Sequence, residues 1–272
     1  MSNEVSTNKT ITINADNEVV VYLYDDVNEN TGKDIVFQLQ AMEQIVIEML
    51  TTNEQLAETA KMPIPKLRFR ISSCGGSMYD LLAITNMIER LKELGVTVIT
   101  EANGYAMSAG FFLLLLGDLR TVSGEFHTEL LYHTVVYSAI GKNGNMMKRE
   151  IDRCNKIILK KFQNIMLEQT KVTQEMLDEY EEKDWLMDVS EARELEILND
   201  EKLMKEYCES QGINVNDVDE SNNEILLSDM IKTLEGQGIK VVNDLNQETE
   251  EVEDKPEEKP KAKKVRKTKK SE

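Results

Sequence analysis

Residues 66–100 read KLRFRISSCGGSMYDLLAITNMIERLKELGVTVIT, and this stretch decides the fold. A strand at Lys66–Ser72 is followed by a turn that contains Gly75-Gly76, and then by a helical pattern that Gly95 ends. Val96–Thr100 is a second, β-branched strand. A strand, a glycine turn, a helix and a strand in this order predict a mostly parallel sheet of an α/β protein.

The same alternation continues in both directions along the chain. Before residue 66, Val19–Tyr24 has the composition of a buried strand, and the apolar residues of Asp34–Thr51 recur at the spacing of one helix face. After residue 100, Gly104–Gly110 leads into a short apolar helix. Further elements are expected as strands at Arg120–Val122 and Glu129–Val136, and as helices at Met146–Gln169, from Val172 to Tyr180, and at Glu191–Leu198.

Composition divides the 272 residues into four segments. We expect a flexible N-terminal segment over 1–17, one folded domain over 18–200, a helical extension over 201–246 and a disordered charged tail over 247–272. The folded part is of the size that a single core can fill.

The charge of the chain is strongly uneven. The net charge is −18, yet residues 259–270 hold eight Lys or Arg and no acidic residue, which leaves about −26 on the remainder. Such a body repels phosphates, so we expect no specific nucleic-acid partner. The basic tail is predicted to be a solvated appendage, with docking to an acidic partner as the alternative.

Three widely spaced cysteines form neither a disulfide framework nor a metal motif, which favours a reducing compartment. The first eight residues lack the basic-then-apolar order of a signal peptide. The longest apolar run, Ala109–Leu116, is too short to span a bilayer. We therefore expect a cytoplasmic protein without a membrane partner.

Acyl transfer to a serine needs a nucleophile at a sharp turn, a neutral imidazole nearby and a carboxylate that orients the imidazole. Ser108 meets the first need, because it lies between small residues at a predicted junction of a strand and a helix. The N–H of Ala109 and one from the Gly75-Gly76 turn could face a developing oxyanion there. An ordinary helix N-cap and an ordinary turn are the structural alternatives.

Histidine is scarce, and a serine triad must use either His127 or His133. His133 ends the apolar stretch Leu130–Tyr132, so a strand could carry it to the rim of the sheet, whereas His127 falls in a turn-like segment. We therefore favour His133 as the base, and a hydrogen-bonded structural histidine is the alternative. The two histidines are six residues apart without a thiolate partner, which fits no zinc motif, so we predict no metal.

Several motifs then follow in a recognisable order: ISSCGGS at 71–77, GYAMSAG at 104–110, LLYH at 130–133, KDWLMDVSEA at 183–192 and LND at 198–200. In order and spacing they resemble the proteolytic subunit of the ATP-dependent Clp protease, from about Val19 to Asp200. Carried over position by position, the resemblance assigns five groups: the nucleophile Ser108, the general base His133, the orienting carboxylate Asp184, and the backbone N–H groups of Gly76 and Ala109 as an oxyanion hole. The residues alone leave Asp178, Asp184 and Asp188 equally eligible, and the resemblance selects Asp184.

The resemblance also implies an assembly. Family members stack heptameric rings around an internal chamber that a ring ATPase feeds with unfolded chains. We accordingly expect the Clp and crotonase type of β-α superhelical fold, a homo-oligomeric ring (heptamer or tetradecamer), unfolded polypeptide substrates, a ring-ATPase partner and no cofactor. The long helix Met146–Gln169 would be the handle that joins two rings.

Some positions depart from the family pattern. Cys74 stands where Pro is usual, Thr134-Val135 where Gln-Pro is usual, and Glu196 where Gly is usual. With the abundant Asn and Lys, these departures favour a divergent member, such as a bacteriophage protein that processes capsid or scaffold proteins in the host cytoplasm. A catalytically silent ring subunit and an acyl-CoA enzyme of the crotonase type are the remaining alternatives.

Overall fold

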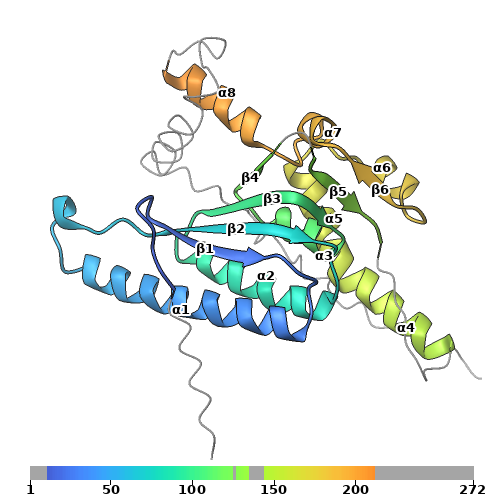
Figure 1. Cartoon of the computed structure of the whole chain (residues 1–272), viewed down its shortest axis with the longest axis horizontal. Helices are drawn as coiled ribbons and strands as arrows, with labels where there is room; N and C mark the ends of the chain where they lie inside the picture. Colours follow the sequence, from blue (N-terminus) through green and yellow to red (C-terminus); the bar gives the residue numbers. More distant parts are fainter. Residues whose placement is uncertain (1–10, 125–126, 135–143, 212–272) are drawn as a thin grey trace, which may run out of the picture. The chain divides into compact units, whose positions relative to one another are not determined.

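The computed structural model describes residues 11–124, 127–134 and 144–211 (Figure 1). All of them belong to the first of two compact units, residues 1–240; the second unit, residues 241–272, lies outside the described residues. The elements in chain order are β1 (Glu18–Leu23), α1 (Glu29–Asn53), a 3-10 turn η1 (Glu58–Ala60), β2 (Lys66–Ser73), α2 (Met78–Glu93), β3 (Val98–Met107), α3 (Ala109–Leu114), β4 (Leu119–Val122), β5 (Glu129–Tyr132), α4 (Gly144–Cys154), a π-helical segment η2 (Asn155–Leu159), α5 (Lys160–Gln169), α6 (Gln174–Glu179), β6 (Trp185–Met187), α7 (Val189–Glu194) and α8 (Asp200–Gln211).

The strands form one sheet in the order β1-β2-β3-β5-β6, and β4 also pairs with β3. Every pair is parallel except β5 with β6, which is antiparallel. The connections from β1 to β2 and from β2 to β3 each contain a helix, as parallel neighbours require. The predicted α/β fold with a mostly parallel sheet is therefore confirmed.

The core lies between the sheet and its helices. Alternate side chains of β1 and β2 are at most 2% exposed: Val19, Val21, Leu23, Leu67, Phe69 and Ile71. Helices α1 and α2 lie side by side along the sheet (Figure 1) and bury their apolar stripes in the same core. Each fully buried Leu, Ile or Phe contributes about 1.5–3 kcal/mol, so this layer fixes the position of β3.

Helix α1 begins five residues before the predicted start because of a capping box. The Asn28 side chain accepts the N–H groups of Asn30 and Thr31 at 2.9 and 3.2 Å, and the Thr31 hydroxyl accepts the Asn28 N–H at 3.0 Å. These bonds satisfy N–H groups that a helix end otherwise leaves without partners.

Strand β3 is the branching strand of the sheet. Its first half, Ile99–Ala102, pairs with β4, and its end, Tyr105–Met107, pairs with β5. It is longer than the predicted strand at 96–100, because a register shift between Ile71 and Ser73 lets β2 pair with it as far as Ala106. The chain therefore reaches Ser108 directly from a paired strand.

The predicted long helix is one helical run over 144–169 with a π-helical segment at Asn155–Leu159. Its predicted apolar stripe is buried at Cys154, Ile158, Phe162, Ile165 and Met166. The Phe162 ring stacks on Phe112 of α3, with 4.8 Å between ring centroids. This contact docks the helix on the element that follows Ser108.

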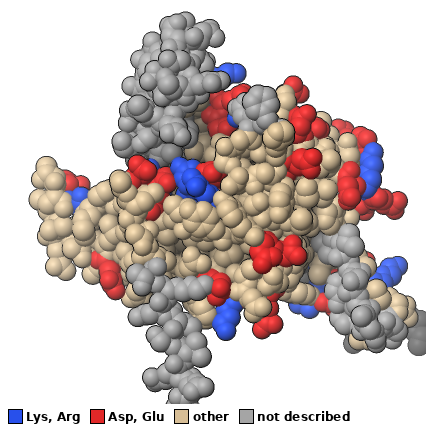
Figure 2. Space-filling view, in the orientation of Figure 1, with Lys and Arg blue, Asp and Glu red and all other residues tan. Residues whose placement is uncertain are grey.

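The ends of the chain are described in part. In the expected segment 1–17, Ile13 pairs with Val19, and the Asn14 side chain accepts the N–H groups of Asp16 and Glu18. The expected extension over 201–246 is described as far as Gln211, in α8, and the expected tail over 247–272 lies outside the described residues. On the face drawn in Figure 2, carboxylates are spread widely, in keeping with the net charge of −18.

Candidate functional site

Ser108 lies at a sharp turn between two elements. Strand β3 ends at Met107, α3 begins at Ala109, and Ser108 between them has φ 54° and ψ −118°. A residue with a side chain in this region carries a strain of about 1–3 kcal/mol. The Ser108 N–H donates to the carbonyl of Leu131 at 2.9 Å, which fixes the turn to β5. The junction predicted from the sequence is thus a strained turn at a strand end.

The Gly75-Gly76 loop packs directly against Ser108. The two glycines have φ of 103° and 135°, and a Cβ on Gly75 would lie 2.6 Å from the Cβ of Ser108. A Cβ on Gly76 would lie 2.2 Å from the carbonyl oxygen of Val27. No other residue fits either position, because both the backbone conformation and the space exclude a side chain.

Three hydrogen bonds hold this loop. The Val27 N–H donates to the Gly75 carbonyl at 2.6 Å, and the Ser77 N–H donates to the Val27 carbonyl at 2.7 Å. The Gly75 N–H donates to the Ser73 hydroxyl at 3.1 Å. Within the described residues, the N–H groups of Gly76 and Ala109 have no hydrogen-bond acceptor. Two donors beside Ser108 therefore remain available to a ligand oxygen.

The strand register brings His133 and Asp184 to the same edge of the sheet. In the antiparallel pair β5–β6, Tyr132 lies opposite Trp185, so the next positions outward are His133 and Asp184. In the parallel pair β3–β5, Met107 lies beside Leu131. Ser108, His133 and Asp184 therefore each adjoin the end of one of three neighbouring strands.

The three side chains are not joined by hydrogen bonds. The Nδ1 atom of His133 contacts the carbonyl of Thr134, and Asp184 is exposed. Among the described residues, no hydrogen bond links Ser108 to His133 or His133 to Asp184. Hydrogen bonds between catalytic side chains often form only when substrate binds. The position of the three residues at the strand ends is therefore the feature that bears on the site.

Other predicted candidates lie elsewhere. His127 is exposed in the turn before β5. Asp178 accepts the Gln174 amide at 2.7 Å on α6, and Asp188 caps α7 by accepting the N–H of Glu191. In the described part of the chain, no three His, Cys, Asp or Glu side chains form a cluster that could hold a metal ion.

An aromatic layer supports the strands beneath the site. Tyr132 is fully buried, its ring meets Trp185 edge-on with 6.4 Å between centroids, and burial raises the pKa of its phenol. The Gln163 amide donates to the Tyr132 hydroxyl at 2.9 Å. The Trp185 indole N–H donates to Glu191 at 2.9 Å, and its ring stacks on Tyr180. Sequence reasoning missed these supports, although Trp185 is the one tryptophan of the chain.

Two departures from the expected pattern have clear local structures. Cys74 is exposed in the loop before Gly75 and makes no disulfide. Glu196 has φ 57°, the left-handed conformation that glycine adopts without strain, and its carboxylate pairs with Lys171 at 2.9 Å and Lys202 at 2.6 Å. These ion pairs accommodate a side chain where glycine is usual.

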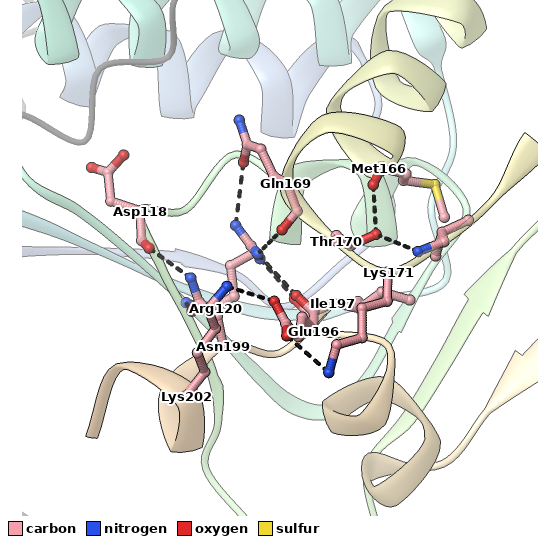
Figure 3. A network of polar contacts seen from close by, with 11 residues as sticks. Asp118, Arg120, Met166, Gln169, Thr170, Lys171, Glu196, Ile197, Asn199 and Lys202 are labelled. Atoms are coloured by element: carbon pink, nitrogen blue, oxygen red, sulfur yellow. Dashed lines mark hydrogen bonds and ion pairs between the residues drawn. The ribbon is translucent and has the colours of Figure 1, made fainter. Parts of the chain in front are cut away.

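A second polar cluster surrounds Arg120 of β4 (Figure 3). Its guanidinium donates to the carbonyls of Ile197 at 2.7 Å, Glu196 at 3.0 Å and Gly117 at 3.2 Å, and more weakly to Gln169. Burial lowers the pKa of Arg120 to about 10, so the side chain stays charged at neutral pH. Every N–H of the guanidinium has an acceptor within the described residues, so this cluster stabilises the fold.

The family model described as Clp protease matches residues 3–200, and none of the curated proteins compared is significantly similar. Within the described residues, every helix is either too short or too polar to cross a membrane. The matched span contains the candidate site and every strand of the described residues.

Proposed function

The chain belongs to the Clp protease family, and we propose that it is a serine endopeptidase in which Ser108, His133 and Asp184 act as a catalytic triad. The observation that carries this proposal is the pairing of β3 with β5 and of β5 with β6. That pairing gives the three residues adjoining positions at one sheet edge, although they are far apart in sequence.

The local backbone gives further support. A strained serine at a turn between a strand and a helix exposes its hydroxyl, and strain of this kind concentrates at functional sites. The N–H groups of Gly76 and Ala109, the residues that follow Gly75 and Ser108, have no acceptor in the described part of the chain. Two such donors stabilise the oxyanion of a tetrahedral intermediate, and loss of one donor typically costs about 10²–10³ in kcat.

The proposed reaction follows from these positions. His133 Nε2 takes the proton of Ser108 as the Oγ attacks the peptide carbonyl, and the oxyanion accepts hydrogen bonds from Gly76 and Ala109. The protonated imidazole then gives its proton to the leaving amine, so the C–N bond breaks and an acyl-enzyme forms. Water, deprotonated by His133, releases the acid and restores Ser108.

One side-chain movement is required before this reaction. The His133 Nδ1–H that now meets the Thr134 carbonyl must turn toward Asp184, which is the next residue outward on the neighbouring strand. Asp184 is exposed and forms no hydrogen bond within the described residues, so no contact has to break on its side. We infer that substrate or a neighbouring subunit favours this rotation.

A fluorophosphonate probe tests the proposal directly, because it labels only an activated serine. We expect label on Ser108, identified by peptide mapping, and none in Ser108→Ala. His133→Ala and Asp184→Asn should lose labelling while keeping the unfolding midpoint. Ser123→Ala, an exposed serine elsewhere, is the matched control and should label normally. Equal labelling of His133→Ala and the wild type would refute the triad.

We also propose that the chain forms a homo-oligomeric ring that takes unfolded polypeptides and works with a ring ATPase. Family membership supports this, and so do exposed aromatic side chains in β1 and β3 and just after β1, namely Tyr22, Tyr105 and Tyr24, at 52, 37 and 51% exposure. Light scattering should give a heptamer or tetradecamer of the 31.1 kDa chain. A monomer at all concentrations would exclude the ring but not the triad chemistry.

A further inference from the structure

A cleft lies beside the segment that follows His133. Its volume is about 380 Å³, and it is bounded by the helical run of α4, η2 and α5 and by α6 with the loop that leads to Asp184. Thr134 lines one end, and Glu181 and Glu182 line another. The Thr134 hydroxyl donates to the Glu181 carbonyl at 2.9 Å and ties these two segments together. The cleft is therefore lined by residues one position after His133 and two positions before Asp184 in the chain.

The cleft has an apolar floor and an acidic rim. Leu159 and Leu177 are 4% and 1% exposed on its floor, and Asp178, Glu181 and Glu182 are exposed at its rim. Of the described residues that line it, none is a lysine or an arginine. The Glu181 and Glu182 carboxylates form neither ion pairs nor hydrogen bonds with the rest of the described chain. The rim thus offers unpaired negative charge above an apolar surface.

Asn155 adds an independent sign of a missing ligand. It lines the cleft at the first residue of η2, where the helix widens to a π turn. Its Oδ1 is shielded from solvent and has no hydrogen-bond donor among the described residues. A buried acceptor without a donor is destabilising and is rare in folded proteins. A ligand in the cleft that carries N–H donors would supply the absent partner once the Asn155 side chain turns its Oδ1 toward the cleft.

We propose that this cleft binds a lysine or arginine side chain of the polypeptide substrate, adjacent to the scissile bond. The alkyl stem would pack on Leu159 and Leu177, as long cationic side chains do on apolar surfaces. The cationic head would meet Glu181 and Glu182. One of its N–H groups would donate to Asn155 Oδ1 after that side chain turns toward the cleft. An acidic side chain would be repelled by the rim, and a purely apolar one would leave Asn155 without a donor. The proposal rests on the proposed peptidase function and adds its substrate class.

Matched peptides separate charge from shape. We would use internally quenched peptides that differ in a single residue: arginine, its neutral isostere citrulline, or norleucine. One series places this residue before the cleaved bond, and a second series places it after the bond. Mass spectrometry of the products fixes the bond that is cut. In one series, kcat/KM for arginine should exceed that for citrulline about tenfold or more, the size of a charge-assisted hydrogen bond. The ratio should fall as salt is added.

Two variants and a control locate the effect. The double variant Glu181→Gln, Glu182→Gln should bring the ratio of arginine to citrulline close to one. Asn155→Leu should lower the ratio of arginine to norleucine and retain the folded state, because it replaces an unpaired buried amide by an apolar group. Glu175→Gln changes the same charge on the exposed surface of α6 outside the cleft and should keep both ratios.

The outcomes distinguish this proposal from the one on which it rests. If Ser108 takes the fluorophosphonate and all three peptides are cleaved at equal rates, the peptidase function stands and the basic subsite is wrong. A preference for norleucine over arginine would likewise overturn the basic subsite. If neither labelling nor cleavage occurs, the peptidase function fails and the substrate class fails with it.

Discussion

Two different polar clusters adjoin the two halves of strand β3. Its first half pairs with β4, which holds Arg120, and its end leads to Ser108 beside β5. Arg120 is 3% exposed and donates to three carbonyls and to Gln169. At the Ser108 end, the N–H groups of Gly76 and Ala109 have no acceptor within the described residues. One cluster is saturated with internal hydrogen bonds, and the other is not.

This difference separates a polar group that stabilises the fold from one that is available to a ligand. Burying a charge is tolerated only where its hydrogen bonds are complete, and that is the case at Arg120. Backbone donors without an acceptor contribute nothing to the stability of the fold. The two donors beside the strained serine therefore belong to the second kind, which is available to a ligand. Substitutions at the two clusters should accordingly change different quantities.

The largest expected effect is on catalysis at Ser108. Ser108→Ala should lower the rate of peptide hydrolysis by about 10⁵–10⁶-fold, because the nucleophile of a triad is lost. Its free energy of unfolding should change by less than about 0.5 kcal/mol, since the hydroxyl forms no hydrogen bond within the described residues. A peptide assay and urea denaturation measure the two quantities.

Ser108→Gly sharpens this experiment. Glycine adopts φ 54° without a Cβ penalty, so this variant should be equally inactive but about 1 kcal/mol more stable than Ser108→Ala. Equal stabilities of the two variants would show that the turn is not strained. A large loss of stability in both would place Ser108 with Arg120 among the structural groups.

At Arg120 the expected effect is on stability. Arg120→Met should cost about 3–5 kcal/mol in the free energy of unfolding, because it leaves the carbonyls of Gly117, Glu196 and Ile197 buried without donors. The catalytic rate of the molecules that remain folded should be close to the wild type. Titration with fluorophosphonate counts the active sites and so separates rate from folded fraction.

Arg120→Lys provides the control for charge. A lysine keeps the positive charge but cannot donate in the planar fork of a guanidinium, so most of the loss should remain. If Arg120→Lys were as stable as the wild type, charge alone and not the set of hydrogen bonds would explain the cluster.

Much of the fold could be predicted from local sequence, because the patterns in residues 66–100 predict strands and a helix separated by glycine turns. Strand β6 could not, since Trp185–Met187 is too short for a pattern of alternation to register. Its pairing with β5 is set by tertiary packing, in which the Trp185 ring stacks on Tyr180 and meets Tyr132.

Prediction of the candidate site from the sequence was limited by the same strand, β6. Ser108 and His133 could be proposed from a predicted strand end and from the scarcity of histidine. Asp184 could be selected only by family resemblance, because its relation to His133 depends on the antiparallel register of β5 and β6. The side-chain supports at Gln163 and Glu191 come from elements far along the chain, and no local pattern marks them.

A smaller effect on the free energy of unfolding is expected at the ion pair of Glu18 in β1 with Arg68 in β2. Burial alone would raise the pKa of Glu18, but the hydrogen bonds and charge of Arg68 outweigh it, and the pKa is lowered from its ordinary 4.5. A lowered carboxylate pKa stabilises the fold above the unfolded-state value, and this stabilisation is lost as pH falls through the folded-state value. Glu18→Gln should therefore cost about 1–2 kcal/mol at pH 7 and progressively less below pH 4.5.

Urea denaturation at pH 7 and pH 3 measures how the difference in unfolding free energy between Glu18→Gln and the wild type decreases with pH. Glu48→Gln, which removes an exposed carboxylate on α1 that forms no ion pair with the rest of the described chain, is the control and should be nearly neutral at both pH values. A gap between Glu18→Gln and wild type that stays constant down to pH 3 would mean that the Glu18 charge is not the cause.

The smallest effect is expected at Glu196, where backbone strain and ion pairing oppose each other. Its carboxylate pairs with Lys171 and Lys202, and both partners are largely exposed, so Glu196→Gln should cost no more than about 0.5–1 kcal/mol. Glu196→Gly loses the same pairs but relieves φ 57°, which recovers about 1 kcal/mol. Glu196→Gly should therefore unfold at a higher urea concentration than Glu196→Gln, by a margin that salt does not change, because strain is not screened. If the two variants were equal, the ion pairs rather than the backbone would explain how this turn tolerates a side chain where glycine is usual.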